Sequence, residues 1–210
     1  MNITIIGASA GIGLETVKRG INRNHLITTL SRTEIEIVEK KSFNMILGDA
    51  TNKVDLLNSI QSADALIVTL GTGKNMKATT LFSDFAKLIV EIHSERKIEI
   101  PLIFVTGFGA GESKNYVPWL VKMFLKYLLK DVYADKTKME EIIVNSDLKW
   151  TVVRPGRLLD KKLTEIYRVE NKLFKGINIG GINRADVADF LIKQAEKQTE
   201  LKKYIAISEK

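Results

Sequence analysis

Short apolar runs rich in β-branched residues alternate along the chain with longer segments whose apolar residues recur at helical spacing. Parallel strands joined by crossover helices produce this alternation. Two of the runs, residues 65–68 and 102–105, are apolar without interruption, as expected for central strands covered on both faces. The pattern therefore predicts an α/β fold with a doubly wound, mostly parallel sheet of about six to seven strands and helices on both faces.

The predicted elements extend over the whole chain. We expect strands over residues 2–6, 25–30, 43–47, 64–70, 101–106, 149–153 and 203–207. We expect helices over residues 11–22, 52–61, 77–96, 117–146 and 184–198. No internal repeat and no linker rich in Pro, Gly or Ser divides them. We therefore predict one domain over residues 1–210, with a small substrate-side portion from about residue 155 to 183.

A glycine-rich segment lies directly between the first strand and the first helix. It consists of Gly7, Ala8, Ser9, Ala10, Gly11, Ile12 and Gly13. Glycines in this place provide a tight turn, close approach of the backbone to a pyrophosphate, and close helix packing. The helix that follows presents free backbone N–H groups and a positive dipole end to phosphates. The segment therefore predicts a Rossmann-type domain that binds a nicotinamide dinucleotide.

The end of the second strand selects between the two nicotinamide dinucleotides. An acidic residue there would bind the ribose 2′-hydroxyl of NAD, but this chain carries Ser31 and Arg32. The guanidinium of Arg32, assisted by the Ser31 hydroxyl, would pair with a 2′-phosphate. The sequence therefore favours NADP(H) as the cofactor. NAD(H) is the alternative, with Glu34 in the ribose role.

Two further strand ends supply candidate cofactor contacts. After the third strand, Asp49 and Ala50 would frame the adenine ring, and Asp49 would accept a hydrogen bond from its amino group. An N-cap or turn role before the next helix is an equally good interpretation of Asp49. After the fourth strand come Leu70, Gly71 and Thr72, where the glycine lets the chain pass close to the nicotinamide half of the cofactor.

Composition and charge limit the chemistry. The chain has no cysteine, and His25 and His93 are isolated, so we predict no disulfide, no metal site and no cysteine nucleophile. The formal net charge of +7 favours anionic ligands. Because the lysines are scattered and no RNA-reading or zinc-finger spacing accompanies them, we predict no nucleic-acid partner. The sequence has neither a secretion signal nor an apolar run of roughly 18 residues, so we predict a cytoplasmic protein with no membrane partner.

Four segments in the second half of the chain carry a family resemblance. They are FVTGFGAGES at 104–113, VYADK at 132–136, SDLKWTVVRPGRL at 146–158 and INRADVADF at 182–190. With the glycine segment, they make the chain resemble the atypical short-chain dehydrogenase/reductases, in the NAD(P)H-binding, biliverdin/flavin reductase-like subgroup. The resemblance covers nearly the whole length and implies an NAD(P)H-dependent reductase.

The resemblance also assigns residues to the reaction centre. Thr106 takes the family's Ser position, where its hydroxyl would either donate to a substrate oxygen or only cap the strand end. Lys136 takes the family's Lys position, and both residues would also contact the cofactor. The family's Tyr, four residues before the Lys, would fall at Val132. Tyr133 is the candidate in its place, although it lies one residue late and thus about 100° further round the helix. The segment expected to approach the nicotinamide or the cofactor phosphates is Arg154, Pro155, Gly156 and Arg157.

The displaced Tyr bears on the reaction. Without a well-placed Tyr, reduction of an ordinary ketone lacks its general acid. A flat, conjugated small-molecule acceptor such as a flavin or quinone fits better, because its proton can come from solvent. The alternative function is a non-catalytic NAD(P)-binding redox sensor.

An apolar, aromatic segment precedes Lys136 in the sequence. Within it, Tyr116 and Trp119 are candidates for contacts with the acceptor. Alternatively, the segment forms an amphipathic helix that packs on the sheet or at a dimer interface. The protein is accordingly predicted to be a monomer or a homodimer.

Overall fold

The computed structural model describes residues 1–37, 41–73 and 78–210. The strands are β1 (Asn2–Ile6), β2 (Leu26–Ser31), β3 (Phe43–Leu47), β4 (Ala65–Val68), β5 (Leu102–Val105), β6 (Trp150–Pro155), β7 (Arg157–Leu159), β8 (Tyr167–Glu170), β9 (Gly181–Asn183) and β10 (Tyr204–Glu209). The helices are α1 (Gly11–Asn22), α2 (Lys53–Ile60), α3 (Leu81–Arg96), α4 (Trp119–Leu128), α5 (Lys130–Val144) and α6 (Arg184–Glu196), with a short 3-10 helix at Gly111–Asn115.

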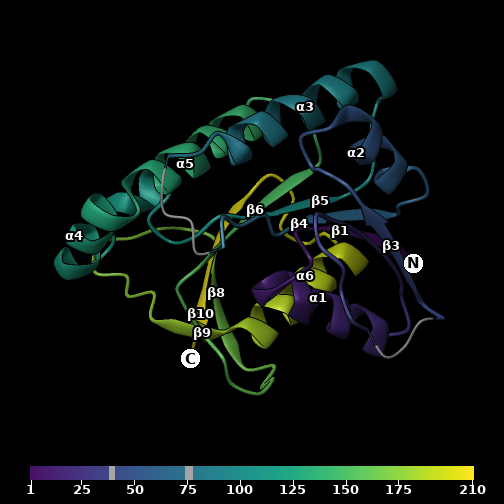
Figure 1. The fold of residues 1–210 in the computed structure, drawn as a ribbon. Helices are drawn as coiled ribbons and strands as arrows, with labels where there is room; N and C mark the ends of the chain where they lie inside the picture. The colour runs from purple at the N-terminus through teal and green to yellow at the C-terminus, as the bar shows by residue number, and fades with distance from the viewer. Residues whose placement is uncertain (38–40, 74–77) are drawn as a thin grey trace.

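Eight of these strands form one sheet in the order β3-β2-β1-β4-β5-β6-β10-β8. All neighbours are parallel except β10 and β8. Helices α1 and α6 cover one face of the sheet, and α2, α3 and α5 cover the other (Figure 1). This arrangement confirms the predicted doubly wound Rossmann fold. The sheet is larger than the six to seven strands expected from the sequence.

The extra strand comes from the segment predicted to form the substrate side. β8 pairs antiparallel with β10 at the edge of the sheet, and β7 pairs with β9 in a separate two-stranded sheet. Residues in β8 are only partly buried or exposed. An edge strand of this kind carries no continuous apolar run, and the sequence pattern therefore did not reveal it.

The predicted helix over residues 117–146 is in fact two helices. The chain leaves the helical conformation at Leu129, whose φ of −124° separates α4 from α5. No glycine or proline marks this position, so the helical periodicity of the sequence runs through the break. The predicted helix over 77–96 begins at Leu81; residue 77 lies outside the described residues.

An apolar core lies on each face of the sheet. On the α1 and α6 side, Ile5 packs with Val187 and Leu191. On the α3 and α5 side, Phe85 packs with Phe104, with their ring centres 6.4 Å apart. The central strands β4 and β5 are buried along their whole length, as their uninterrupted apolar runs predicted. Among the described residues, no helix is both long and apolar enough to cross a membrane.

Candidate functional site

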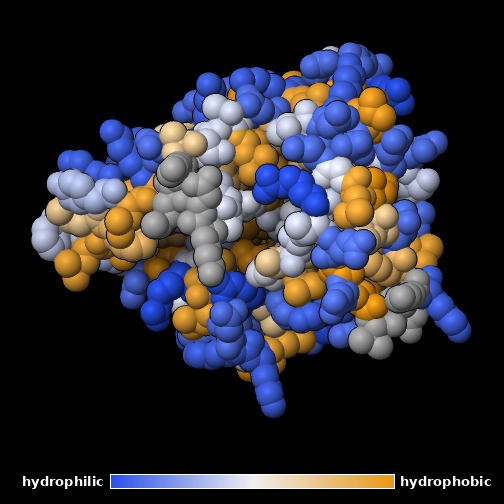
Figure 2. All heavy atoms as spheres, in the orientation of Figure 1, coloured by the Kyte–Doolittle hydropathy of each residue, from blue (hydrophilic) through white to orange (hydrophobic). Residues whose placement is uncertain are grey.

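A cavity of about 720 Å³ opens beyond the carboxyl ends of the central strands, where the strand order reverses between β1 and β4. Doubly wound sheets bind their ligands in this crevice. A hollow is visible near the centre of the face drawn in Figure 2. The predicted site residues that line the cavity are Gly7, Ser9, Ala10, Gly11, Ile12, Ser31, Arg32, Asp49, Ala50, Leu70, Gly71, Thr72, Thr106, Tyr133, Lys136, Pro155, Gly156 and Arg157.

The glycine segment is held tightly against the end of β4. A Cβ atom on Gly7, whose φ is +81°, would lie 2.8 Å from the carbonyl oxygen of Thr69. A Cβ atom on Gly13 would lie 2.2 Å from the carbonyl oxygen of Gly7. Gly13 and the fully buried Ala8 therefore support the segment from behind and do not line the cavity.

The first turn of α1 is available to an anion. Its N-cap residue, Ala10, makes no side-chain cap hydrogen bond, and no acidic residue lies in the first turn. The first backbone N–H groups of the helix therefore need an external acceptor. Together with the close-packed glycines, this arrangement fits the pyrophosphate of a dinucleotide.

The end of β2 provides the second feature that fits the cofactor. The buried Ser31 hydroxyl lines the cavity and finds no hydrogen-bond partner among the described residues. Arg32 follows it and is exposed at the same edge of the cavity. Glu34, the alternative ribose ligand, is exposed and does not line the cavity. A hydroxyl and a guanidinium side by side suit a 2′-phosphate.

Asp49 lines the cavity and also fills the turn role anticipated for it. Its Oδ1 atom accepts hydrogen bonds from the backbone N–H and the hydroxyl of Thr51, each at 2.8 Å. These hydrogen bonds lower the pKa of Asp49, so its carboxylate is ionised at neutral pH. The N-cap of α2 is a different residue, Asn52, which accepts from the N–H groups of Val54 and Asp55.

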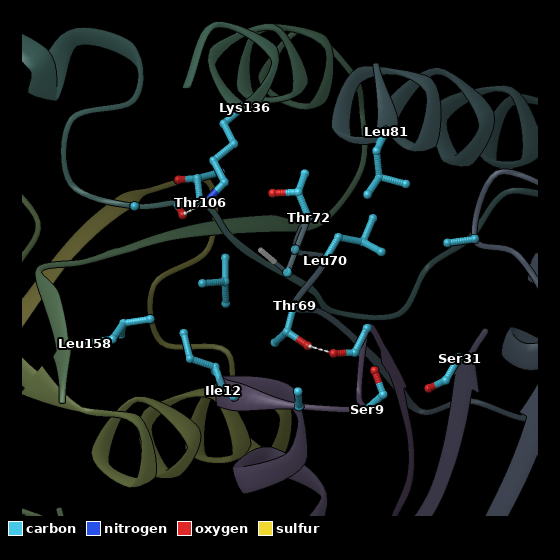
Figure 3. A pocket seen from close by; sticks show the side chains of 18 of the residues that line it. Ser9, Ile12, Ser31, Thr69, Leu70, Thr72, Leu81, Thr106, Lys136 and Leu158 are labelled. Carbon is cyan, nitrogen blue, oxygen red and sulfur yellow. Dashed lines mark hydrogen bonds between the residues drawn. The ribbon is translucent and has the colours of Figure 1, made fainter. Parts of the chain in front are cut away.

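Lys136 lies at the other end of the cavity, next to Thr106 (Figure 3). Its Nζ atom donates a hydrogen bond to the Thr106 carbonyl oxygen at 2.7 Å. Burial lowers the pKa of Lys136 to about 8, against the opposing influence of Glu140. The Thr106 hydroxyl donates to Glu140 Oε1 at 2.6 Å. Because a hydroxyl has one hydrogen, Thr106 can only accept a further hydrogen bond from a ligand.

Tyr133, and not Val132, faces the cavity. Val132 is buried in the apolar core on the α3 and α5 side of the sheet. Tyr133 lies three residues before Lys136 and therefore on the same face of α5. The Lys136 Nζ atom is 5.3 Å from the centre of the Tyr133 ring. The Tyr133 hydroxyl is close to Gly107, since a Cβ atom there would lie 2.8 Å from it. Burial raises the pKa of Tyr133.

Arg154 does not approach the cavity, so that part of the expectation for the segment after β6 is wrong. Its buried guanidinium donates to Glu140 at 2.7 and 3.0 Å and to Glu112 at 2.7 and 2.9 Å. It also lies over the Tyr204 ring, 4.0 Å from its centre. Arg154 stays away from the cavity because these two carboxylates neutralise its guanidinium charge inside the protein. Glu140 thereby joins Arg154 to the Thr106 hydroxyl.

Removing the Glu140 carboxylate should destabilise the protein strongly. We expect Glu140→Ala to lower the free energy of unfolding by about 3 kcal/mol, because the buried Arg154 guanidinium would lose one of its two carboxylate partners. Urea denaturation measures the change. Glu141→Ala is the matched control, since Glu141 is exposed on the same helix. Equal stability of the two variants would contradict a stabilising role for the buried network.

The structure places both candidate acceptor contacts away from the cavity lining. Trp119 is 70% exposed at the start of α4, and Tyr116 packs beside a small apolar cluster that includes Phe108 and Val117. No residue of α4 is buried, so this helix does not pack on the sheet. The other half of the alternative interpretation, packing at a dimer interface, stays a prediction. The exposed apolar residues of α4 also include Leu120, Val121, Phe124, Tyr127 and Leu128.

Several lining residues were not anticipated from the sequence. Thr69, Gly107 and Leu158 adjoin predicted residues in the sequence, and Leu81 is the first residue of α3; all four line the cavity. Arg184, the first residue of α6, comes from a distant part of the chain. The only sequence signal for it is its place in the INRADVADF segment, which carries the family resemblance but points to no site residue.

The chain is similar to a known protein family and to several solved structures. The family model described as NAD(P)H-binding matches residues 7–198. The fold is shared with a putative NADH-flavin reductase from Streptococcus pneumoniae TIGR4, SP1627, at a TM-score of 0.81 and 22% identity, covering 100% of both chains. It is shared with ChuY, an anaerobillin reductase from Escherichia coli O157:H7, at a TM-score of 0.78 and 18% identity, covering 100% of this chain and 97% of the other.

A third solved structure contains a nicotinamide cofactor. It is a short-chain dehydrogenase/reductase from Veillonella parvula DSM 2008 in complex with NADP, with a TM-score of 0.79 and 17% identity, covering 99% of this chain and 94% of the other. The TM-scores of these three structures show that they share the fold of this chain. The NAD(P)H-binding family model agrees with the NAD(P)H-binding part of the predicted resemblance.

Proposed function

The chain belongs to the NAD(P)H-binding family, and from this premise we propose that it is an NAD(P)H-dependent oxidoreductase of the atypical short-chain dehydrogenase/reductase type. The proposed reaction is hydride transfer to a flat, conjugated small-molecule acceptor, such as a flavin or a quinone. The observation that carries the proposal is the meeting of Thr106, Tyr133 and Lys136 in the same cavity as the glycine segment. The reductase names of two proteins with the same fold support this class.

The cavity residues divide into those that would hold the cofactor and those that would serve the reaction. The glycine segment would hold the pyrophosphate, and Ser31 and Arg32 would hold a 2′-phosphate. Leu70, Gly71 and Thr72 would flank the nicotinamide half. When bound, the reduced cofactor supplies the hydride.

Residues of this chain would supply the proton that completes each two-electron reduction. Burial raises the pKa of Tyr133, so its hydroxyl keeps a proton at neutral pH. The Lys136 cation beside the ring would stabilise the phenolate that remains after the proton leaves. Tyr133 would then be the general acid that the sequence spacing did not place at Val132, so the choice of acceptor no longer rests on a proton from solvent. An acceptor with an oxygen to protonate, such as a quinone, suits the site.

The cofactor preference can be tested at the end of β2. We expect NADPH to bind about tenfold tighter than NADH, because the Arg32 guanidinium and the unpaired Ser31 hydroxyl suit a 2′-phosphate. Arg32→Ala should remove most of this margin. Calorimetric titration with both cofactors measures it, and Arg96→Ala, an exposed arginine on α3, is the control. Equal affinities of the wild-type protein for the two cofactors would reject the NADP(H) assignment.

Turnover separates the proposed reductase from a sensor. The purified protein is mixed with NADPH and either FMN or a small quinone, and oxidation of the cofactor is followed. A reductase oxidises one NADPH for each acceptor reduced by two electrons. A non-catalytic sensor, which the burial of Val132 at the family's Tyr position would favour, binds NADPH tightly and oxidises none across the acceptor panel.

A further inference from the structure

Arg184 lies over the beginning of the phosphate-binding helix. It is the first residue of α6, which packs beside α1 on the same face of the sheet (Figure 1). A Cβ atom built on Gly11, the first residue of α1, would lie 3.7 Å from the Arg184 Nε atom and 4.0 Å from its Cδ atom. Arg184 lines the same cavity as the glycine segment. The positive charge of Arg184 and the free N–H groups at the start of α1 therefore attract an anion to the same place.

Within the described part of the chain, the Arg184 guanidinium pairs with a single, exposed carboxylate. Its Nη1 atom donates to Asp160 at 2.5 Å, and the Asp160 side chain is 83% exposed. By contrast, Arg154 contacts two carboxylates through four hydrogen bonds, and Arg19 pairs with the buried Asp189. Exposed ion pairs are weak, and a guanidinium has five N–H donors. Most donors of Arg184 are therefore available to another anion.

We propose that Arg184 binds the pyrophosphate of the dinucleotide, and that Asp160 competes with this pyrophosphate for the Arg184 guanidinium. The proposal rests on the proposed function and deepens it. Arg184 would contact the phosphates from the α6 side, next to Gly11 of the glycine segment. Asp160 would hold the arginine while the site is empty and would release it when the cofactor enters.

Binding titrations of the full chain with NADPH test this arrangement. We expect Arg184→Ala to weaken NADPH binding roughly 10- to 100-fold, because a charge-assisted contact with the cofactor is lost. Asp160→Asn should strengthen binding about two- to fivefold, since the competing carboxylate is removed. In the Arg184→Ala background, Asp160→Asn should have no further effect. Arg96→Ala, outside the cavity, serves as the control.

A structural role for Arg184 gives a different pattern. Thermal denaturation shows whether Arg184→Ala fails to fold. If it does, Arg184→Lys, which keeps the charge, and Asp160→Asn take its place in the NADPH titrations. The inference is overturned if Arg184→Ala binds NADPH like the wild-type protein, or if Asp160→Asn acts equally with and without Arg184. If the wild-type protein binds no nicotinamide cofactor, the proposed function fails as well. Wild-type binding with unaffected variants overturns this inference alone.

Discussion

Replacing Tyr133 by Phe is expected to lower the turnover number with a quinone acceptor about 10²- to 10⁴-fold, the usual contribution of a positioned general acid. The hydroxyl faces the cavity near Gly107, and Lys136 lies beside the ring. Because Phe keeps the ring, affinity for NADPH should change little. Steady-state oxidation of NADPH with a small quinone measures the effect. Tyr127→Phe, on the exposed α4, is the matched control and should retain wild-type turnover.

The pH dependence of the turnover number tests the role of Lys136 in the same site. Burial lowers the pKa of Lys136 to about 8, so the cation is present below that pH and is lost above it. If the cation stabilises the phenolate, the turnover number should fall as the pH rises through about 8. In Lys136→Met, turnover should be low at all pH values and this step should be absent. For the Tyr133→Phe variant described above, unchanged turnover would contradict the proposed general acid and show that the proton comes from solvent.

Replacing Gly13 by Ala should weaken NADPH binding on the order of 100-fold, since one or two charge-assisted contacts with phosphate would be lost. The new Cβ atom would lie 2.2 Å from the Gly7 carbonyl oxygen and 2.6 Å from the Thr69 hydroxyl. The Gly7 backbone can yield only if the phosphate-binding segment changes shape. Overpacking should also cost about 1–3 kcal/mol of the free energy of unfolding. Calorimetric titration and urea denaturation measure the two effects.

Gly180→Ala is the matched control for this change. Its Cβ atom would meet nothing within 4 Å, and Gly180 does not line the cavity. We therefore expect wild-type affinity and stability within about 0.5 kcal/mol for this surface position. Wild-type NADPH affinity in Gly13→Ala would contradict the assignment of the glycine segment to phosphate binding.

The central part of the fold could be predicted from the sequence because burial on both faces leaves a direct pattern. Strands β4 and β5 are uninterrupted apolar runs, and the glycine segment begins where β1 ends. The edge strand β8 left no such pattern because its residues are only partly buried or exposed. The separation of α4 from α5 was hidden because Leu129 continues the apolar periodicity while its backbone leaves the helix.

The candidate site was only partly predictable, because several of its properties depend on which way side chains face. Tyr133 lies one residue late for the family's spacing from Lys136, about 100° further round the helix, yet residues three apart on a helix also share a face. The motif containing Arg154 suggested a cofactor contact, but two carboxylates distant in the sequence hold that side chain inside the protein. Arg184 reaches Gly11 only through the packing of α6 against α1.

We propose above all that the cavity between the glycine segment and Lys136 binds a nicotinamide dinucleotide. The most direct measurement is a calorimetric titration of the wild-type protein with NADPH, repeated with Gly13→Ala. We expect saturable binding of one NADPH per chain, lost or greatly weakened in the variant. Absence of NADPH and NADH binding to the folded wild-type protein would contradict it, because the glycine segment would then be only a turn in a Rossmann-type fold.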